Sequence, residues 1–401
     1  MIDTTPNKID AAVHSGLADA VELSRSLYRE PELAYHEVKS SQKIVNLLRE
    51  NGYQVEYPFL EKELGYGTAF RAVLKNGEGP SVAILTEYDA LPGLGHACGH
   101  NLHGAMSTLA GMALAKLTDQ FQGTVYVIGT PAEEENGAKV VMEQQGVFKD
   151  MALAEMIHSY SGGVSQTNME VLSLRCYEIE FHGLTAHSVA GPWHGHSALA
   201  AARKFLDLVD ARRECFTPDV FVNSIIQEGG RSPNIIPDTA KLRMEFRTNS
   251  RGRLEQLDEI VRKCAQGAAL ALDCTVTFEP GLQDFWDMVR VSSLEQEARA
   301  IMECRGETVS EPAPACGSSD IGNVSYQCPS IQMLLSITDE TFALHTEGMR
   351  EATQKPKAFE QLEKGACVLT ELALRTLNDA RFRMQIREDF QKEREIKDQM
   401  K

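Results

Sequence analysis

The sequence predicts an α/β protein in which a larger domain has a mostly parallel, mixed sheet flanked by helices and carries a smaller inserted α+β domain. Two observations support this. Short apolar runs alternate with helical patterns in the first 150 residues, whereas strands after about Val171 alternate in hydrophobicity with a period of two. We expect residues 1–171 and 288–401 to form one discontinuous domain and residues 172–287 to form the insert.

The composition limits the class of protein. A chain of 401 residues is long enough for two domains with their own cores. Its 40 basic and 57 acidic residues give a net charge of −17, which repels phosphate backbones and anionic lipid, so we expect neither nucleic acid nor a membrane as partner. The N-terminus lacks an apolar signal segment, and nine cysteines without regular spacing are typical of a reducing compartment. We therefore expect a cytoplasmic protein.

The elements of the larger domain follow from local patterns. Apolar residues recur at three- and four-residue intervals in two predicted helices, Asp19–Tyr28 and Val38–Glu50. A third predicted helix, His103–Leu117, is rich in Ala, Leu and Met. Asn51-Gly52 ends the second helix. Two short apolar runs, Ser81–Thr86 and Thr124–Gly129, are predicted buried strands. Strand, helix and strand in this order indicate a parallel sheet.

The predicted insert contains four strands and two helices. The strands are Ser173–Phe181, Val220–Gln227, Ala240–Arg247 and Cys274–Phe278, and the helices are Ser197–Ala211 and Leu254–Ala271. The charged C-terminal stretch Arg381–Lys401 is predicted to be a solvated helix rather than a binding tail.

Side chains that bind metals or protons follow the predicted strands. Cys98 and His100 lie on a glycine-hinged segment, Glu133 and Glu134 follow a strand, and His158 ends another apolar run. Each group alone has an ordinary explanation, such as a buried cysteine or a solvated acidic face. Open α/β sheets place their binding crevice at the ends of strands, so the groups together indicate a two-metal hydrolytic site.

Six motifs occur in order between about residues 20 and 375. They are Tyr88-Asp-Ala-Leu-Pro, Ala97-Cys-Gly-His-Asn, Pro131-Ala-Glu-Glu, Gly183-Leu-Thr-Ala-His-Ser, Gly229-Gly-Arg-Ser-Pro-Asn-Ile-Ile-Pro-Asp and Leu344-His-Thr-Glu. In these motifs the chain resembles the M20 metallopeptidase family, above all its amidohydrolase branch. That branch includes aminobenzoyl-glutamate hydrolases, auxin-conjugate hydrolases and M20-domain dipeptidases. The resemblance implies a catalytic α/β domain with an inserted α+β lid.

The resemblance also implies the roles of individual residues. Cys98, His100, Glu134, His158 and His345 match the metal ligands, and Glu133 matches the general base. The implied cofactor is a pair of divalent transition-metal ions, zinc or manganese with cobalt as a further possibility. Glu133 would take a proton from water and deliver it to the leaving amine. The loop Gly317–Ser325 resembles that of the dipeptidase and aminobenzoyl-glutamate subgroups.

Three residues of the lid match substrate-contacting residues of the family. His187 matches the residue that stabilises the oxyanion, often across a dimer interface, and Asn234 and Arg247 match residues that hold the substrate's carboxylate. The implied partners are a small-molecule substrate with a carboxylate and a second copy of the chain, bound through the lid. The chain departs from the common family pattern at Asn101 and in the residues that follow His158 and His345.

These observations predict a metal-dependent hydrolase that cleaves the amide bond of a small N-acyl or aminoacyl amino acid or dipeptide. One alternative uses the same site to release ammonia from an aryl amine or amidine. A metal-storage protein is a second alternative, but storage does not require Glu133. A zinc-stabilised scaffold is disfavoured because structural zinc sites are compact and rich in cysteine.

Overall fold

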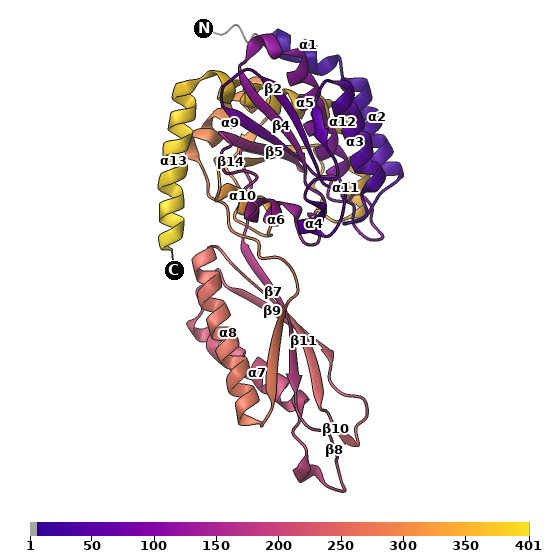
Figure 1. Cartoon of the computed structure of the whole chain (residues 1–401), viewed down its shortest axis with the longest axis vertical. Helices are drawn as coiled ribbons and strands as arrows, with labels where there is room; N and C mark the ends of the chain where they lie inside the picture. Colours follow the sequence, from indigo (N-terminus) through magenta and orange to yellow (C-terminus); the bar gives the residue numbers. More distant parts are fainter. Residues whose placement is uncertain (1–5, 401) are drawn as a thin grey trace. The chain divides into compact units, whose positions relative to one another are not determined.

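The computed structural model describes residues 6–400, which separate into two compact units (Figure 1). The first unit comprises residues up to 170 together with 288–395. The second comprises residues 171–287 together with the chain from residue 396 onward. The insert predicted from the sequence, 172–287, differs from the second unit by one residue at its start and by this C-terminal segment.

An eight-stranded sheet forms the centre of the first unit, in the order β1-β2-β4-β3-β5-β14-β6-β13. Its parallel centre consists of β4 (Gly123–Gly129), β3 (Ser81–Thr86), β5 (Leu153–Tyr160) and β14 (Ser330–Ser336). The flanking strands are β1 (Gln54–Glu56), β2 (Phe70–Asn76), β6 (Ser165–Gln166) and β13 (Val309–Ser310). The central strands are almost entirely buried, as in sheets covered on both faces. The predicted mostly parallel sheet is confirmed.

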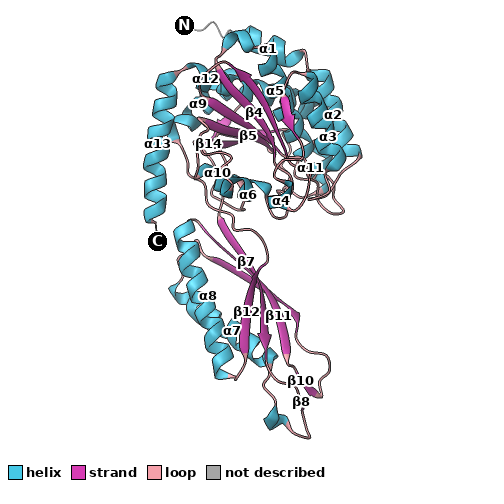
Figure 2. Ribbon diagram, viewed as in Figure 1, coloured by secondary structure: helices cyan, strands magenta, loops and turns pink. Residues whose placement is uncertain are grey.

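Helices flank this sheet (Figure 2). They are α1 (Pro6–His14), α2 (Leu17–Arg29), α3 (Val38–Glu50), α4 (Glu61–Leu64), α5 (His100–Lys116), α6 (Ala138–Gln144), α9 (Ser292–Cys304), α10 (Ile321–Ser325), α11 (Glu347–Ala352), α12 (Pro356–Asn378) and α13 (Ala380–Gln399). Helix α5 is buried on all sides from His100 to Leu114 and packs against α2, α12 and the sheet. This burial explains its composition of Ala, Leu, Met and Gly.

Helix α5 begins three residues earlier than predicted, at His100. The residue before it, Gly99, has a φ of +91°, and a Cβ there would lie 2.7 Å from Cβ of Ser159. Only glycine fits this close approach in the left-handed region. As a result, the segment expected as a loop becomes the first turn of a buried helix, with His100 and His103 on one face. Strand β5 also runs past His158, which the apolar pattern places just after the strand.

The second unit is a four-stranded antiparallel sheet in the order β12-β7-β11-β9, with α7 (Ala198–Arg212) and α8 (Arg251–Ala271) packed against it. Its strands are β7 (Ser173–His182), β9 (Phe221–Glu228), β11 (Thr239–Thr248) and β12 (Thr275–Pro280). A two-stranded ladder of β8 (Ala186–His187) and β10 (Ile235–Ile236) lies beyond the sheet. The inward-facing residues, among them Phe181, Phe205 and Phe246, form a separate hydrophobic core. This agrees with the predicted smaller α+β unit, and the sheet is antiparallel throughout.

Candidate active site

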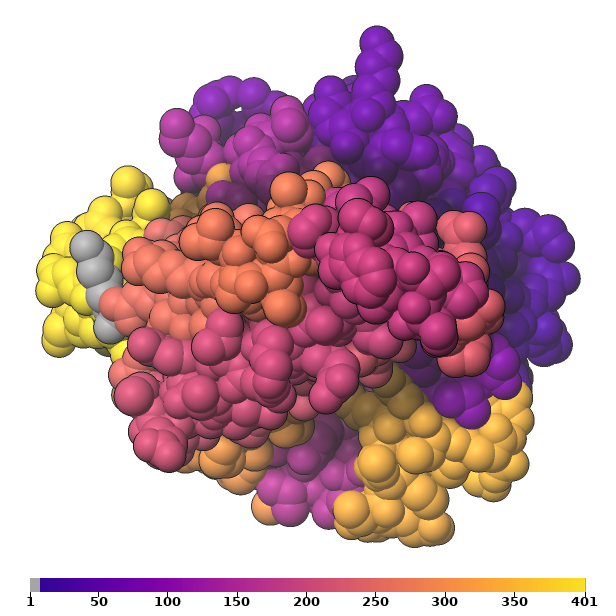
Figure 3. Space-filling model, turned by 90° about the horizontal axis from the view of Figure 1, so that it is seen from below, coloured from indigo at the N-terminus to yellow at the C-terminus, as the bar shows by residue number. Residues whose placement is uncertain are grey.

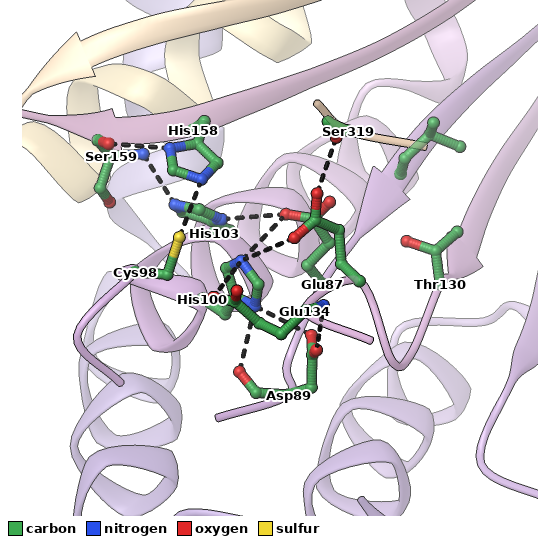
Figure 4. Close-up of polar contacts among 12 residues, drawn as sticks. Glu87, Asp89, Cys98, His100, His103, Thr130, Glu134, His158, Ser159 and Ser319 are labelled. Atoms are coloured by element: carbon green, nitrogen blue, oxygen red, sulfur yellow. Dashed lines mark hydrogen bonds and ion pairs between the residues drawn. The ribbon is translucent and has the colours of Figure 1, made fainter. Parts of the chain in front are cut away.

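Five elements of the first unit bring the proposed metal ligands and Glu133 together, and Figure 4 labels Cys98, His100, Glu134 and His158 among them. Glu87 and Asp89 follow β3, Cys98 and His100 stand at the start of α5, and Glu133 and Glu134 follow β4. His158 lies on β5, and His345 precedes α11. These elements meet because the parallel strands β3, β4 and β5 are neighbours and their carboxyl ends share one edge of the sheet.

The five predicted metal ligands form a continuous cluster. Sγ of Cys98 lies 3.3 Å from Nε2 of His158, and Nε2 of His345 lies 3.3 Å from Oε2 of Glu134. Nε2 of His100 lies 4.0 Å from Oε1 of Glu134. Two overlapping sets, Cys98 with Glu134 and His345, and His100 with Glu133 and Glu134, each place their ligand atoms within 4.8 Å of one another. Such spacing suits a cation held between them.

Two atoms of this cluster are buried without a hydrogen-bond partner among the described residues: Nε2 of His100 and Oε1 of Glu134. His100 is fixed on its other side, where Nδ1 donates to Oδ1 of Asp89 at 2.9 Å, so Nε2 is the ring nitrogen that could bind a cation in place of a proton. An unpartnered buried polar atom is costly. A divalent transition-metal ion fits this pair of donors, with imidazole, thiolate and carboxylate as ligands.

His158 has the protonation state of a metal ligand, whereas Cys98 would reach it only with a cation bound. Nδ1 of His158 donates to the carbonyl of Ser159 at 2.8 Å, so its lone pair at Nε2 faces Cys98. Burial lowers the pKa of His158 to about 4, which keeps the imidazole neutral. Burial raises the pKa of the Cys98 thiol well above its usual value, so a bound cation would be needed to stabilise the thiolate.

Asp89 orients two of the proposed ligands. Besides the bond from His100, its Oδ2 accepts the backbone N–H of Glu134 at 3.0 Å. This is the orienting role that carboxylates play behind metal-binding histidines. Asp89 stands in the motif Tyr88-Asp-Ala-Leu-Pro, but the sequence did not assign it this contact.

His103, three residues after His100 on α5, does not offer a free nitrogen. Its Nδ1 donates to Oε2 of Glu87 at 3.2 Å, and its Nε2 accepts the backbone N–H of Ser159 at 2.7 Å. Both ring nitrogens are therefore used, although Glu87, His100, His103 and His158 also form a compact ligand-like group. His103 supports the site and is not available as a ligand in this arrangement.

Glu133 is held beside the ligands by a serine from the far end of the chain. Ser319 donates its hydroxyl to Oε1 of Glu133 at 2.7 Å, while Oε2 lies 4.0 Å from Nε2 of His100. Burial, together with the carboxylates of Glu87 and Glu134, raises the pKa of Glu133 well above its ordinary value. A carboxylate with a raised pKa next to a ligand set suits general-base chemistry.

Sequence reasoning missed a buried ionic network behind Glu133. Lys139, on α6, donates hydrogen bonds to Glu87 and to Asp320, and none of the three side chains is exposed. Lys139 stands in an ordinary helical pattern and gave no signal. Asp320 lies in the loop Gly317–Ser325, and the resemblance of this loop to the dipeptidase and aminobenzoyl-glutamate subgroups was the one signal in the sequence that could have pointed to the network.

The predicted lid residues lie in the second unit, at two separate places. His187, on β8, pairs with Ile235 on β10, directly after Asn234, and the carbonyl of Asn234 accepts the N–H of Ser188. Arg247 stands near the opposite end of β11 and donates to Glu245 at 2.6 Å. The stretch of β11 from Thr239 to Arg247 alone spans about 26 Å at ~3.3 Å per residue. His187 and Asn234 are thus neighbours, whereas Arg247 is remote from both within one chain.

Asn101, which departs from the common family pattern, faces away from the ligands. It is buried, and its Nδ2 donates to Oγ of Ser24 on α2 at 3.1 Å. Glu135, the third carboxylate of the acidic run, is exposed. Neither residue joins the ligand cluster.

The chain is similar to known proteins of one peptidase family. The model of peptidase family M20/M25/M40 matches residues 83–375. The chain is 33% identical over 352 residues to the Xaa-Arg dipeptidase of Mus musculus, covering 82% of this chain and 79% of that protein. It is 29% identical over 291 residues to a p-aminobenzoyl-glutamate hydrolase subunit of Escherichia coli (strain K12), covering 67% of this chain and 59% of that one.

A solved structure shares the fold. It is a dinuclear metal-binding peptidase of the M20 family from Bacillus subtilis, with a TM-score of 0.68 and 22% identity, covering 91% of this chain and 99% of that chain. No helix in residues 6–400 is long and apolar enough to cross a membrane. The family match, the named relatives and the ligand cluster identify an enzyme that hydrolyses C–N bonds. The chain belongs to peptidase family M20/M25/M40.

Proposed function

We propose that this protein is a metal-dependent hydrolase of the amide bond in small N-acyl or aminoacyl amino acids or dipeptides, with Glu133 as general base. One observation carries the proposal. Two buried ligand atoms without hydrogen-bond partners among the described residues, Nε2 of His100 and Oε1 of Glu134, lie beside a carboxylate with a raised pKa. A metal-storage protein would have no use for that third group.

Cys98, His100, Glu134, His158 and His345 would hold two divalent ions, zinc, manganese or cobalt. Bound divalent cations lower the pKa of water and polarise a carbonyl group. Cys and His ligands favour such transition metals over Mg²⁺.

Glu133 would act first as base and then as acid. Its Oε2 lies 4.0 Å from Nε2 of His100, whereas Oε1 is engaged by the hydroxyl of Ser319. Oε2 would accept a proton from the attacking water and then give it to the amine nitrogen as the C–N bond breaks. The raised pKa of Glu133 brings its proton affinity closer to that of the groups with which it exchanges.

His187 would stabilise the negative charge that develops on the carbonyl oxygen. Its Nδ1 accepts the backbone N–H groups of Val189 and Ala190 at 3.2 and 3.1 Å, so Nε2 carries the proton. The side chain is exposed. It therefore offers a fixed N–H donor, which is what an oxyanion requires.

Asn234 and Arg247 would bind the carboxylate end of the substrate. Such a carboxylate is present in a dipeptide and in p-aminobenzoyl-glutamate, the compounds in the names of two relatives. Because these residues lie far apart in one chain, they can serve the same substrate only if one of them comes from a second copy. This separation favours a homodimer.

The edge of the second unit offers a surface for that dimer. Strand β9 is the last strand of its sheet, and Phe221, Ile225 and Ile226 on it are 45–61% exposed. Leu184, Val189, Trp193 and Ile235, near His187, add further exposed apolar area. Figure 3 shows this end of the second unit, with the segment around residues 185–195 in magenta. An unpaired edge strand with apolar side chains is a ready pairing surface for a second chain.

We also propose a reducing, cytoplasmic location. All nine cysteines are free, and five of them are buried: Cys98, Cys176, Cys264, Cys328 and Cys367. Free thiols of this kind are typical of reducing compartments.

A hydrolysis screen tests the proposal. Protein loaded with Mn²⁺, Zn²⁺ or Co²⁺ is incubated with dipeptides ending in arginine, p-aminobenzoyl-glutamate and N-acyl amino acids, alongside aryl amines and amidines. Release of an amino acid from an amide, lost on chelation, is the expected result. Release of ammonia alone would favour the deamination alternative, and metal binding without turnover would favour storage.

A further inference from the structure

The turn that presents Glu133 and Glu134 contains a residue in an unusual conformation. Ala132 has a φ of +59° and is fully buried. Non-glycine residues adopt the left-handed region at a cost, and they keep it only where neighbouring contacts hold them there. His345, another proposed ligand, also has a positive φ, of +61°. Glu134 therefore follows one strained residue in the chain, Ala132, and contacts another, His345.

One side chain from a distant part of the chain holds Ala132. Oε1 of Glu37 accepts the backbone N–H of Ala132 at 2.8 Å, and Oε2 accepts the hydroxyl of Thr68 at 2.9 Å. Glu37 is fully buried. A buried carboxylate that accepts a backbone N–H fixes that peptide group firmly, since no water can replace the bond.

The carboxylate of Glu37 does not cap the helix at whose start the residue stands. It occupies the N-cap position of α3, where an acidic side chain normally accepts N–H groups of the first turn, but it makes no such bond. Glu32 does this instead, accepting the N–H groups of Lys39 and Ser40 at 3.1 and 2.7 Å. The carboxylate of Glu37 is therefore available for the turn at Ala132.

We propose that Glu37 is a positioning residue, which holds Ala132 in its left-handed conformation and thereby sets the places of Glu133 and Glu134. The inference rests on the proposed function, since it assigns those two residues to the reaction. Glu37 itself touches no ligand atom of the cluster and acts through the backbone of the turn.

Four variants test this role: Glu37→Ala, Glu37→Gln, Ala132→Gly and the double variant Glu37→Ala/Ala132→Gly. Glutamine can still accept the N–H of Ala132, so Glu37→Gln should keep kcat within about three-fold. Glu37→Ala should lower kcat by about 10- to 100-fold, with little change in KM, and should weaken Zn²⁺ or Mn²⁺ affinity measured by titration. Glycine adopts the left-handed region without strain. The double variant should therefore recover at least about five-fold of the kcat and metal affinity lost in Glu37→Ala.

Glu32→Ala is the matched control, because it removes a cap of the same helix without touching Ala132. It should lower the Tm while leaving kcat and metal affinity unchanged below the transition. The inference is overturned if Glu37→Ala keeps kcat and metal affinity, if Glu37→Gln loses as much as Glu37→Ala, or if the double variant is no better than Glu37→Ala. Failure of the parent to cleave any amide would instead defeat the proposed function. The metal titrations would still test the positioning role.

Discussion

Nζ of Lys139 lies 2.7 Å from Oε1 of Glu87, and both side chains are fully buried. Asp320 accepts a second hydrogen bond from the same ammonium group, at 2.6 Å. Oxygen atoms of Glu87, Glu133 and Asp320 lie within 4.8 Å of one another. The lysine thus supplies the positive charge for three carboxylates that would otherwise repel one another. Although burial alone would raise the pKa of Glu87, Lys139 and His100 hold it well below its ordinary value.

Lys139→Met should be strongly destabilising, because it leaves buried carboxylates without their partner. We expect the free energy of unfolding to fall by about 3–5 kcal/mol. Urea denaturation measures it, with Lys263→Met as control, since Lys263 pairs with Glu259 in an exposed ion pair. The control should cost at most about 1 kcal/mol. Equal losses in the two variants would contradict the role of Lys139.

His100→Ala and Cys98→Ala should fold but lose most of the bound cation and nearly all turnover. The reason is that each substitution removes one proposed ligand atom from the cluster. Elemental analysis of the purified proteins checks this, with the exposed His14→Ala as control. Activity removed by a chelator should return with Zn²⁺, Mn²⁺ or Co²⁺ and not with Mg²⁺, which binds Cys and His poorly. Unchanged metal content would remove the ligand assignment.

Glu133→Gln should retain metal content and KM while kcat falls by roughly 10² to 10⁴, the range for losing general acid–base catalysis. Glutamine preserves the acceptor for Ser319 but cannot take up a proton. Steady-state kinetics beside elemental analysis separate the two effects. The exposed Glu135→Gln should behave like the parent. If Glu135→Gln were the impaired variant, the base would be misassigned.

Glu155 predicts a pH dependence of stability that does not involve the site. It is fully buried on β5, between Ile84 and Ile331 on the neighbouring strands, and neither carboxyl oxygen has a hydrogen-bond partner among the described residues. Burial raises its pKa well above 4.5 in the folded protein. The unfolded chain releases this proton at lower pH than the folded one. The stabilising contribution is therefore complete below about pH 4.5 and is lost as the pH rises towards the folded pKa.

Glu155→Gln removes this titration. Between pH 5 and the folded pKa, the free energy of unfolding of the parent should fall relative to that of the variant by about 1.4 kcal/mol per pH unit. Urea unfolding at pH 5, 6, 7 and 8 measures it. Parallel stability curves for the two proteins would show that Glu155 is ionised, and paired, in the folded state.

The proposed dimer predicts complementation between inactive proteins. His187→Ala and Glu133→Gln should each be nearly inactive, but after subunit exchange a mixed dimer would contain one site with both residues intact. Mass spectrometry confirms exchange, and a hydrolysis assay should then show partial recovery. Ile225→Arg, on the exposed edge of β9, should give a monomer and abolish the recovery. No recovery after confirmed exchange would mean that His187 acts within its own chain or not at all.

Much of the fold could be predicted from local patterns. The run Ser81–Thr86 is entirely apolar apart from its ends, and it forms β3 within those bounds. Strands of the second unit show the alternation of a sheet with one wet face, as in β11. These patterns are visible in the sequence because each buried position of a strand or helix takes an apolar residue, and the spacing of these positions is fixed by the type of element. Four of the five proposed ligands stand in the quoted motifs, and the fifth, His158, was found at the end of an apolar run.

Only the tertiary structure shows which of the proposed site side chains keep an atom without a hydrogen-bond partner. The resemblance singled out His100, but residue type alone does not separate it from His103. In the part of the chain that the structure describes, only His100 of the two keeps a nitrogen without a hydrogen-bond partner, because Glu87 and the backbone of Ser159 occupy both nitrogens of His103. The contacts Lys139–Asp320 and Glu37–Ala132 join residues 181 and 95 positions apart. No local pattern records such pairs. A hydrogen bond depends on distances of a few tenths of an ångström between atoms, and only the packing of the whole domain sets those distances.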